Sequence, residues 1–252
     1  MRTVIAALDA SAAARPVLEA ARRVADLTGS AVEAVHVAPT ANDTVALLTA
    51  QFGIPLNLVP GPVEDALLER IHADDVVAAV IGARRASAGR QPAGHTAIAL
   101  IERARRPVVV VPPDLLCPQP RSWRRLLVPL EGTSSSTRPV LDALHAVVTA
   151  PVETIVLHVF TPATAPPMLD RPTRDLALWA AEFGARHGPP GALIEYRSGA
   201  VADQVACACD AEHADLVVLS WSQAMTPGHA EVVREVLARS MIPVLLLPVA
   251  TP

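Results

Sequence analysis

The sequence predicts an α/β protein built from two tandem, doubly wound parallel-sheet domains of about five strands each. Three observations lead to this fold class. Short apolar runs alternate with segments of helical periodicity along the chain. The apolar runs are rich in β-branched residues and show little polar alternation, as strands do when helices cover both faces of a parallel sheet. The chain of 252 residues also repeats its own pattern, and its length suits two domains.

The elements of the first copy follow in order from the N-terminus. A helix starts near Pro16, since proline is favoured in the first turn of a helix. Its apolar stripe ends before Gly29, a residue typical of helix ends. A last helix starts near Thr96 and ends by Pro107. Around these helices we expect strands at residues 4–8, 31–37, 54–59, 76–82 and 107–112.

The second copy repeats these segments in the same order. The hexapeptide RPVLEA at 15–20 returns as RPVLDA at 138–143, so a second helix with Pro139 near its start is expected. The strand segments at 31–37 and 106–113 match those at 152–159 and 242–248. Each copy therefore predicts the same alternation of strands and helices.

The spacing between the matching segments grows along the chain, which places an insertion in the second copy at residues 161–188. A proline-rich link at 112–123 breaks both the strand and the helix pattern. The predicted domains are therefore residues 1–115 and residues 124–252.

Composition and charge exclude several classes of protein. A net charge of −4 gives no general attraction for nucleic acid or for an anionic membrane surface. The apolar runs are too short and too often broken by proline to span a membrane. Asp9 interrupts the first apolar run, so no signal peptide is expected, and three cysteines fit a reducing cytoplasm. All 21 basic residues are arginines, as in proteins of GC-rich bacterial genomes.

Cysteines and histidines do not form a metal-binding pattern. Cys207 and Cys209 lie in a segment of helical periodicity, and positions two apart on a helix are separated by about 200°, so these thiols should point apart. A closed zinc site needs four ligands, so we expect no metal site here. His36 and His158 occupy equivalent strand ends in the two copies, and we interpret them as hydrogen-bonded histidines at the edge of the core.

Two loops of the first copy should reach the edge where doubly wound sheets bind ligands: the loop after Asp9 and the loop after Gly82. The second loop ends at a helix start, where free N–H groups and the helix dipole favour an anion. Its glycines permit close backbone approach and its arginines suit phosphate oxygens. These residues are Gly82, Gly89, Gly94, Arg84, Arg85 and Arg90. A phosphate cradle and a plain surface crossover with solvated arginines remain equal alternatives at this point.

Several segments resemble the universal stress protein family, in a tandem form that covers essentially the whole chain. They are ALDAS at 7–11, HVA at 36–38, PGPVEDALLERI at 60–71 and IGARRASAGRQPAGHT at 81–96. This family belongs to the adenine nucleotide alpha hydrolase-like superfamily. Its ATP-binding members use a glycine loop, the aspartate after the first strand and the end of the second strand. The resemblance implies ATP with Mg²⁺ in the first copy, at Asp9, Val37, Gly82, Arg84, Arg85, Gly94, His95 and Thr96.

The loop departs from the family pattern at two of these positions. Arg85 stands where a second glycine is expected, and His95 replaces a serine or threonine that follows the last glycine. The Arg85 side chain either fills the phosphate space or contacts the phosphate itself. The sequence leaves both alternatives open.

The second copy departs further. Glu131 replaces the aspartate, Ser220 replaces the first glycine, and residues 220–231 contain no arginine. We therefore expect a degenerate site that binds no nucleotide. The resemblance implies that this copy pairs with the first through the final strands, which makes an intramolecular pseudo-dimer. It leaves a homodimer of two chains open.

The function implied by the resemblance is that of a cytoplasmic stress-response protein that binds ATP in its first domain and is not an enzyme. One alternative is an interaction scaffold with two degenerate pockets and no nucleotide. Another is an enzyme of the wider superfamily, but DASAAA at 9–14 lacks the SGG-x-DS pattern of its ATP pyrophosphatases. No set of Ser, His and Asp stands out as a catalytic triad either. Slow ATP hydrolysis stays open.

Overall fold

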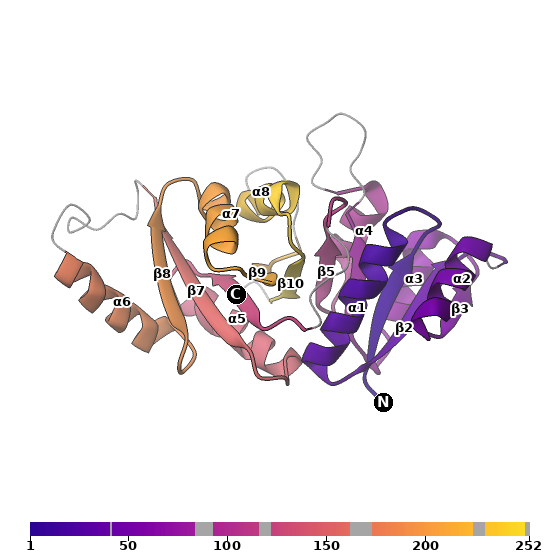
Figure 1. Ribbon diagram of the computed structural model, residues 1–252, viewed down its shortest axis with the longest axis horizontal. Helices are drawn as coiled ribbons and strands as arrows, with labels where there is room; N and C mark the ends of the chain where they lie inside the picture. Colours follow the sequence, from indigo (N-terminus) through magenta and orange to yellow (C-terminus); the bar gives the residue numbers. More distant parts are fainter. Residues whose placement is uncertain (41, 84–92, 116–121, 162–172, 224–229, 250–252) are drawn as a thin grey trace.

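The computed structural model describes residues 1–40, 42–83, 93–115, 122–161, 173–223 and 230–249. Strands and helices alternate through both halves of the chain (Figure 1). The first half contains β1 (Thr3–Leu8), α1 (Ala14–Thr28), β2 (Ala31–Val37), α2 (Asp43–Phe52), β3 (Leu56–Val59), α3 (Val63–Ile71), β4 (Val76–Gly82), α4 (His95–Arg103) and β5 (Val108–Val111). The second half contains β6 (Arg125–Pro129), α5 (Ser134–Val147), β7 (Glu153–Phe160), α6 (Thr173–His187), β8 (Leu193–Ser198), α7 (Val201–Ala211), β9 (Leu216–Trp221), α8 (Glu231–Arg239) and β10 (Val244–Pro248).

All of these strands join one sheet in the order β3-β2-β1-β4-β5-β10-β9-β6-β7-β8. Strands are parallel within each half, and the order of the first half is repeated in the second. The two halves meet where β5 pairs with β10 in antiparallel register, with Val110 opposite Val244. The predicted fold class is confirmed.

Helices cover both faces of the sheet and bury two apolar cores. One core lies between the sheet and α3, α4, α7 and α8, and the other lies between the sheet and α1, α2, α5 and α6. Figure 1 shows the first half in indigo to magenta and the second half in pink to yellow, side by side along the long axis. Each residue of β5 is buried, which explains its unbroken run of valines. No helix in the described part of the chain is long and apolar enough to cross a bilayer.

One predicted detail differs from the structure. α5 begins at Ser134 and contains Pro139 in its interior, whereas the repeat predicted this proline near the helix start. The reason lies in the turn before it, where the N–H of Thr137 donates to the carbonyl of Thr133 at 3.0 Å and starts the helix early. The predicted insertion at 161–188 includes α6, which takes the place in the second half that α2 takes in the first.

The second half also satisfies carbonyl groups at the ends of two helices of the first half. The carbonyl of Leu27 in α1 accepts hydrogen bonds from the N–H groups of Thr149, at 2.8 Å, and Ala150, at 3.1 Å. In α4, the indole of Trp221 donates to the carbonyl of Ile101 at 2.8 Å. Because the last carbonyls of a helix lack partners within the helix, these contacts tie the two halves together on both faces of the sheet.

Candidate functional site

A cavity of about 270 Å³ opens at the carboxyl ends of β1 and β4, between α1, α3 and α4. This is the edge where doubly wound sheets bind ligands. Its wall is mostly apolar, with side chains such as Val17, Leu67 and Leu100. Five residues that the sequence singled out line it together: Asp9, Gly82, Gly94, His95 and Thr96.

Gly82, the last residue of β4, lines this cavity beside α1. A Cβ atom added there would lie 3.4 Å from the Cβ of Ala13 and 3.5 Å from a methyl group of Val17. These are ordinary contact distances, so packing does not require a glycine at this position. A larger side chain would instead occupy the space between β4 and α1.

The N-terminus of α4 faces the same cavity. Gly94 precedes the helix in an extended conformation and, being a glycine, offers no side chain of its own to cap the first turn. The first N–H groups of a helix have no partner within it, and α4 has no acidic residue in this turn. Free amides and the positive end of the helix dipole make this end of α4 suitable for an anion.

Asp9 lies in the turn that leads from β1 to α1. Its carboxylate accepts hydrogen bonds from the backbone N–H of Ser11, at 2.9 Å, and from the Ser11 hydroxyl. The same hydroxyl accepts from the N–H of Ala13 at 3.3 Å. Asp9 therefore has a local structural role, and this turn holds its carboxylate beside the cavity.

The sequence did not single out Glu64, which lies on α3 beside His95. The Oε1 atom of Glu64 is 3.5 Å from the Nε2 atom of His95, whose side chain is 92% exposed. A pairing of this kind depends on the crossing of α3 and α4, and no short-range pattern in the sequence reports it.

Three of the predicted site residues are not placed on this cavity. Val37 ends β2 half-buried against the core, and it is not among the residues that line the cavity. Arg84 and Arg85 lie outside the described residues. The structure therefore does not decide between the two alternatives for the Arg85 side chain.

The paired histidines have the structural role that the sequence predicted. The Nδ1 atom of His36 is 2.9 Å from the carbonyl oxygen of Leu8, and that of His158 is 3.0 Å from the carbonyl oxygen of Leu130. Burial lowers the pKa of His158, because an apolar environment disfavours the charged ring. Both histidines therefore fix the turn that follows the first strand of their half.

The two cysteines of α7 point in different directions. Cys207 is exposed and Cys209 is buried. Burial raises the pKa of the Cys209 thiol to about 12. Over the described ranges, no three His, Cys, Asp or Glu side chains form a group that could hold a metal ion.

The second half keeps a cleft at the equivalent edge, and it is larger, at about 600 Å³. Glu131 and Ser220 line it, in the positions that Asp9 and Gly82 hold in the first half. The helix that faces this cleft, α8, begins with Glu231, whereas α4 begins with His95. A carboxylate in the first turn uses the favourable end of the helix dipole itself, which disfavours a bound phosphate.

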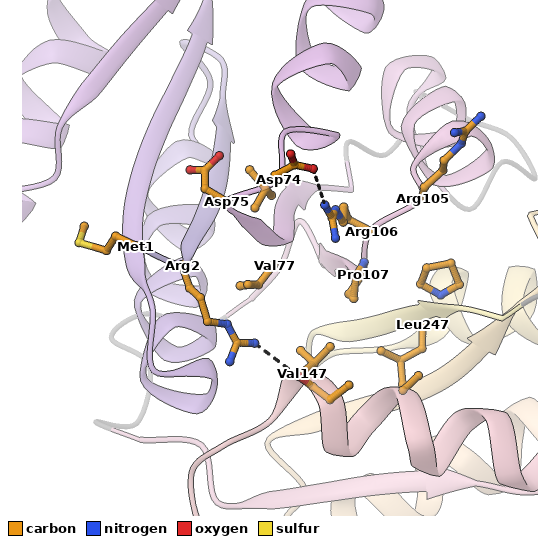
Figure 2. A pocket seen from close by; sticks show the side chains of 14 residues that line it. Met1, Arg2, Asp74, Asp75, Val77, Arg105, Arg106, Pro107, Val147 and Leu247 are labelled. Atoms are coloured by element: carbon orange, nitrogen blue, oxygen red, sulfur yellow. Dashed lines mark hydrogen bonds and ion pairs between the residues drawn. The ribbon is translucent and has the colours of Figure 1, made fainter.

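A larger groove, of about 760 Å³, lies at the opposite edge of the sheet (Figure 2). It lies between the two halves, at the amino ends of β1, β4 and β5 and at the carboxyl end of β10. Figure 2 shows Arg2 directed at α5, where it donates to the carbonyl of Ala146 at 3.4 Å, and Arg106 4.0 Å from Asp74. None of the predicted site residues that the structure describes lines it, so this groove is a poorer candidate despite its volume.

The family model of universal stress proteins matches residues 122–248, which is half of the chain. The chain belongs to the universal stress protein family. The match lies in the second half, whereas the four sequence segments that resemble the family, at 7–11, 36–38, 60–71 and 81–96, lie in the first. This universal stress protein matches no curated protein sequence.

Solved structures share the fold of this universal stress protein over both halves. A protein of unknown function from Pseudomonas aeruginosa PAO1 is 12% identical, with 98% of this chain and 92% of that chain covered at a TM-score of 0.69. A universal stress protein from Archaeoglobus fulgidus DSM 4304 is 16% identical, with 98% of each chain covered at a TM-score of 0.63. At these identities the likeness concerns the fold alone.

Proposed function

We propose that this protein is a cytoplasmic stress-response protein whose first domain, residues 1–115, binds ATP together with Mg²⁺ and does not turn it over. One observation carries the proposal. Asp9, Gly82 and the start of α4 come from three separate segments of the chain and meet on a single cavity at the carboxyl edge of the sheet. The apolar wall suits a nucleobase, and the free end of α4 suits the phosphates.

The residues present fit a Mg-nucleotide. The hydroxyl of Thr96 and the open amides at the start of α4 are donors for phosphate oxygens, and Asp9 adds a carboxylate at the first strand. Mg²⁺ with a nucleotide is held chiefly by the phosphates and by one or two carboxylates. Bound Mg²⁺ would offset the charge that the phosphates bring near Asp9 and Glu64.

The experiment has a chemical arm and a thermodynamic arm. Acid extraction of the purified protein should release adenine nucleotide, detected by chromatography. Mg-ATP at about 100 times its dissociation constant should stabilise the protein by about 2.7 kcal/mol, and Mg²⁺ with adenosine should stabilise it less. If Mg-ATP neither co-purifies nor shifts the melting temperature, the nucleotide part of the proposal is wrong.

Matched substitutions locate the site. Gly82→Val should fill the cavity and abolish the shift with Mg-ATP, whereas Ser220→Val, at the equivalent position of the second half, should leave it unchanged. If the parent chain binds no nucleotide but the Arg85→Gly variant does, the better hypothesis is an interaction scaffold with two degenerate pockets. A steady-state ATPase rate that scales with protein concentration would overturn the non-enzymatic assignment.

The two domains are proposed to act as one unit. β5 and β10 already pair with each other inside one chain, so a homodimer would have to use a different surface. Sedimentation equilibrium distinguishes one chain from two.

A further inference from the structure

Aromatic side chains are scarce in this chain and concentrated in one place. Only 3% of residues are Phe, Trp or Tyr. Four of them gather around α6 and the ends of β7 and β8: Phe160, Trp179, Phe183 and Tyr196. The centre of the Trp179 ring lies 4.8 Å from those of Phe160 and Phe183 and 5.3 Å from that of His158. Trp179 and Phe183 come from α6, whereas Phe160 and Tyr196 come from the two strands that this helix connects.

These rings help to line a side pocket of about 300 Å³ between β7 and α6, which we call the aromatic pocket. Its lining includes Phe160, Trp179 and Phe183, together with the carboxyl groups of Glu131 and Glu182. Glu131 and His158 also line the 600 Å³ cleft, so the two cavities adjoin. A ligand in the aromatic pocket can therefore extend along the apolar floor of the cleft.

The aromatic pocket offers several acceptor groups beside one guanidinium group. The Nδ1 of His158 donates to the carbonyl of Leu130, and burial lowers the pKa of the ring, which favours the neutral form whose Nε2 atom is an acceptor. His187 also lines the pocket, and its Nδ1 atom is buried without a hydrogen-bond partner in the described part of the chain. The guanidinium of Arg186 lies 3.8 Å from the carboxylate of Glu182, which offsets its positive charge. Glu131 adds a further negative charge.

In the first half, an aromatic ring already contacts two cationic side chains. The guanidinium groups of Arg22 and Arg15 lie 4.8 and 5.6 Å from the centre of the Phe52 ring. Within the described ranges, no Arg side chain makes such a contact with the rings of the aromatic pocket. Aromatic faces beside carboxylates attract ammonium groups.

We propose that the second half binds a small organic cation, an ammonium group on an apolar body, with the ammonium in the aromatic pocket and the body along the adjoining cleft. Trp179 supplies a ring face, and Glu131 supplies the opposite charge at the junction of the two cavities. Glu231 at the start of α8 disfavours phosphate. The site is therefore opposite in charge preference to the one proposed in the first half, and it does not depend on nucleotide binding there.

The test uses three probes with the same phenylethyl body: phenethylammonium, 2-phenylethanol and 3-phenylpropanoate. Binding is measured on the full chain without nucleotide, by calorimetry and by saturation-transfer NMR. Phenethylammonium should bind at least about tenfold more tightly than 2-phenylethanol, and 3-phenylpropanoate should bind more weakly than both. Equal binding of the cation and the alcohol overturns the proposal, as does no binding of the cation at about 10 mM.

Variants distinguish binding in the aromatic pocket from non-specific binding elsewhere on the protein. Trp179→Ala and Glu131→Gln should each weaken phenethylammonium binding by about fivefold or more. Their matched controls are Phe52→Ala and Glu69→Gln, an aromatic ring and an exposed carboxyl group in the first half. Thermal melting checks that each variant is folded, and Glu131→Gln keeps the test valid if loss of the Trp179 ring disturbs α6. Equal effects in the test and control variants overturn the proposal.

Discussion

Replacement of Trp221 by Phe should destabilise the whole chain more than the loss of ring volume explains. Trp221 is 2% exposed at the end of β9, and its indole N–H donates to the carbonyl of Ile101, which is 1% exposed in α4. That carbonyl has no substitute donor within the helix, since the N–H of Arg105, four residues on, donates to His72 instead. Trp221→Phe therefore leaves a buried acceptor without a partner.

The expected cost follows from two contributions. A buried carbonyl that loses its hydrogen bond costs about 1–3 kcal/mol. The smaller ring leaves space in a packed core, which adds about 1 kcal/mol. A total of about 2–4 kcal/mol should lower the melting temperature by about 4 °C or more for a chain of this size. Differential scanning calorimetry and urea unfolding both measure it.

Trp123→Phe is the matched control. Trp123 is also buried, at 3% exposure, but its indole nitrogen has no hydrogen-bond partner among the described residues. The control loses similar ring volume and removes an unsatisfied donor, so it should cost less than Trp221→Phe. If the two substitutions cost the same, the bond between the halves does not stabilise α4 as argued.

Three further predictions concern other parts of the molecule. Hydrogen bonds from Arg70 lower the pKa of Asp75 from 3.8 to about 2. Because that carboxylate is 40% exposed, its contribution to stability is only about 1 kcal/mol. This contribution should be complete above about pH 4, fall away toward pH 2, and shrink in Arg70→Met, which keeps the hydrogen bond with Thr3. Urea unfolding at several pH values measures it. Gly132→Ala should cost about 1–3 kcal/mol in the same assay, because φ is +81° and the new Cβ would lie 2.6 Å from the Phe183 ring. Cys209, whose pKa is raised to about 12, should resist iodoacetamide until the protein unfolds, as peptide mass spectrometry can establish.

The fold was predictable because each of its signals is local or repeated. β-branched runs and helical stripes are short-range patterns, and the return of RPVLEA as RPVLDA identifies the duplication directly. The predicted start of α5 was wrong because the hydrogen bond between Thr137 and Thr133 begins the helix ahead of Pro139. Residue preferences describe where a proline is favoured, whereas the turn before it decides where the helix begins.

The site was predictable only where a chain segment ends on the sheet edge. Asp9 follows β1, Gly82 ends β4 and Thr96 lies in the first turn of α4. Because these element ends meet at that edge, topology brings the three residues together. Glu64 and the aromatic pocket escaped prediction because they depend on how two helices cross and on where α6 lies. In the sequence, Trp179 is one apolar residue of the predicted insertion. Only the structure places its ring beside Phe160 on β7.

The structure adds to what the sequence indicates about the second half, which departs from the family pattern. Glu131 and Ser220 indicate a lost nucleotide motif, and such a loss could close the cleft or change its chemistry. The cleft remains open and larger than the first, while the helix start facing it changes from His95 to Glu231. The open volume, the acidic helix start and the gathered rings therefore fit the organic cation proposed for the second half better than a nucleotide.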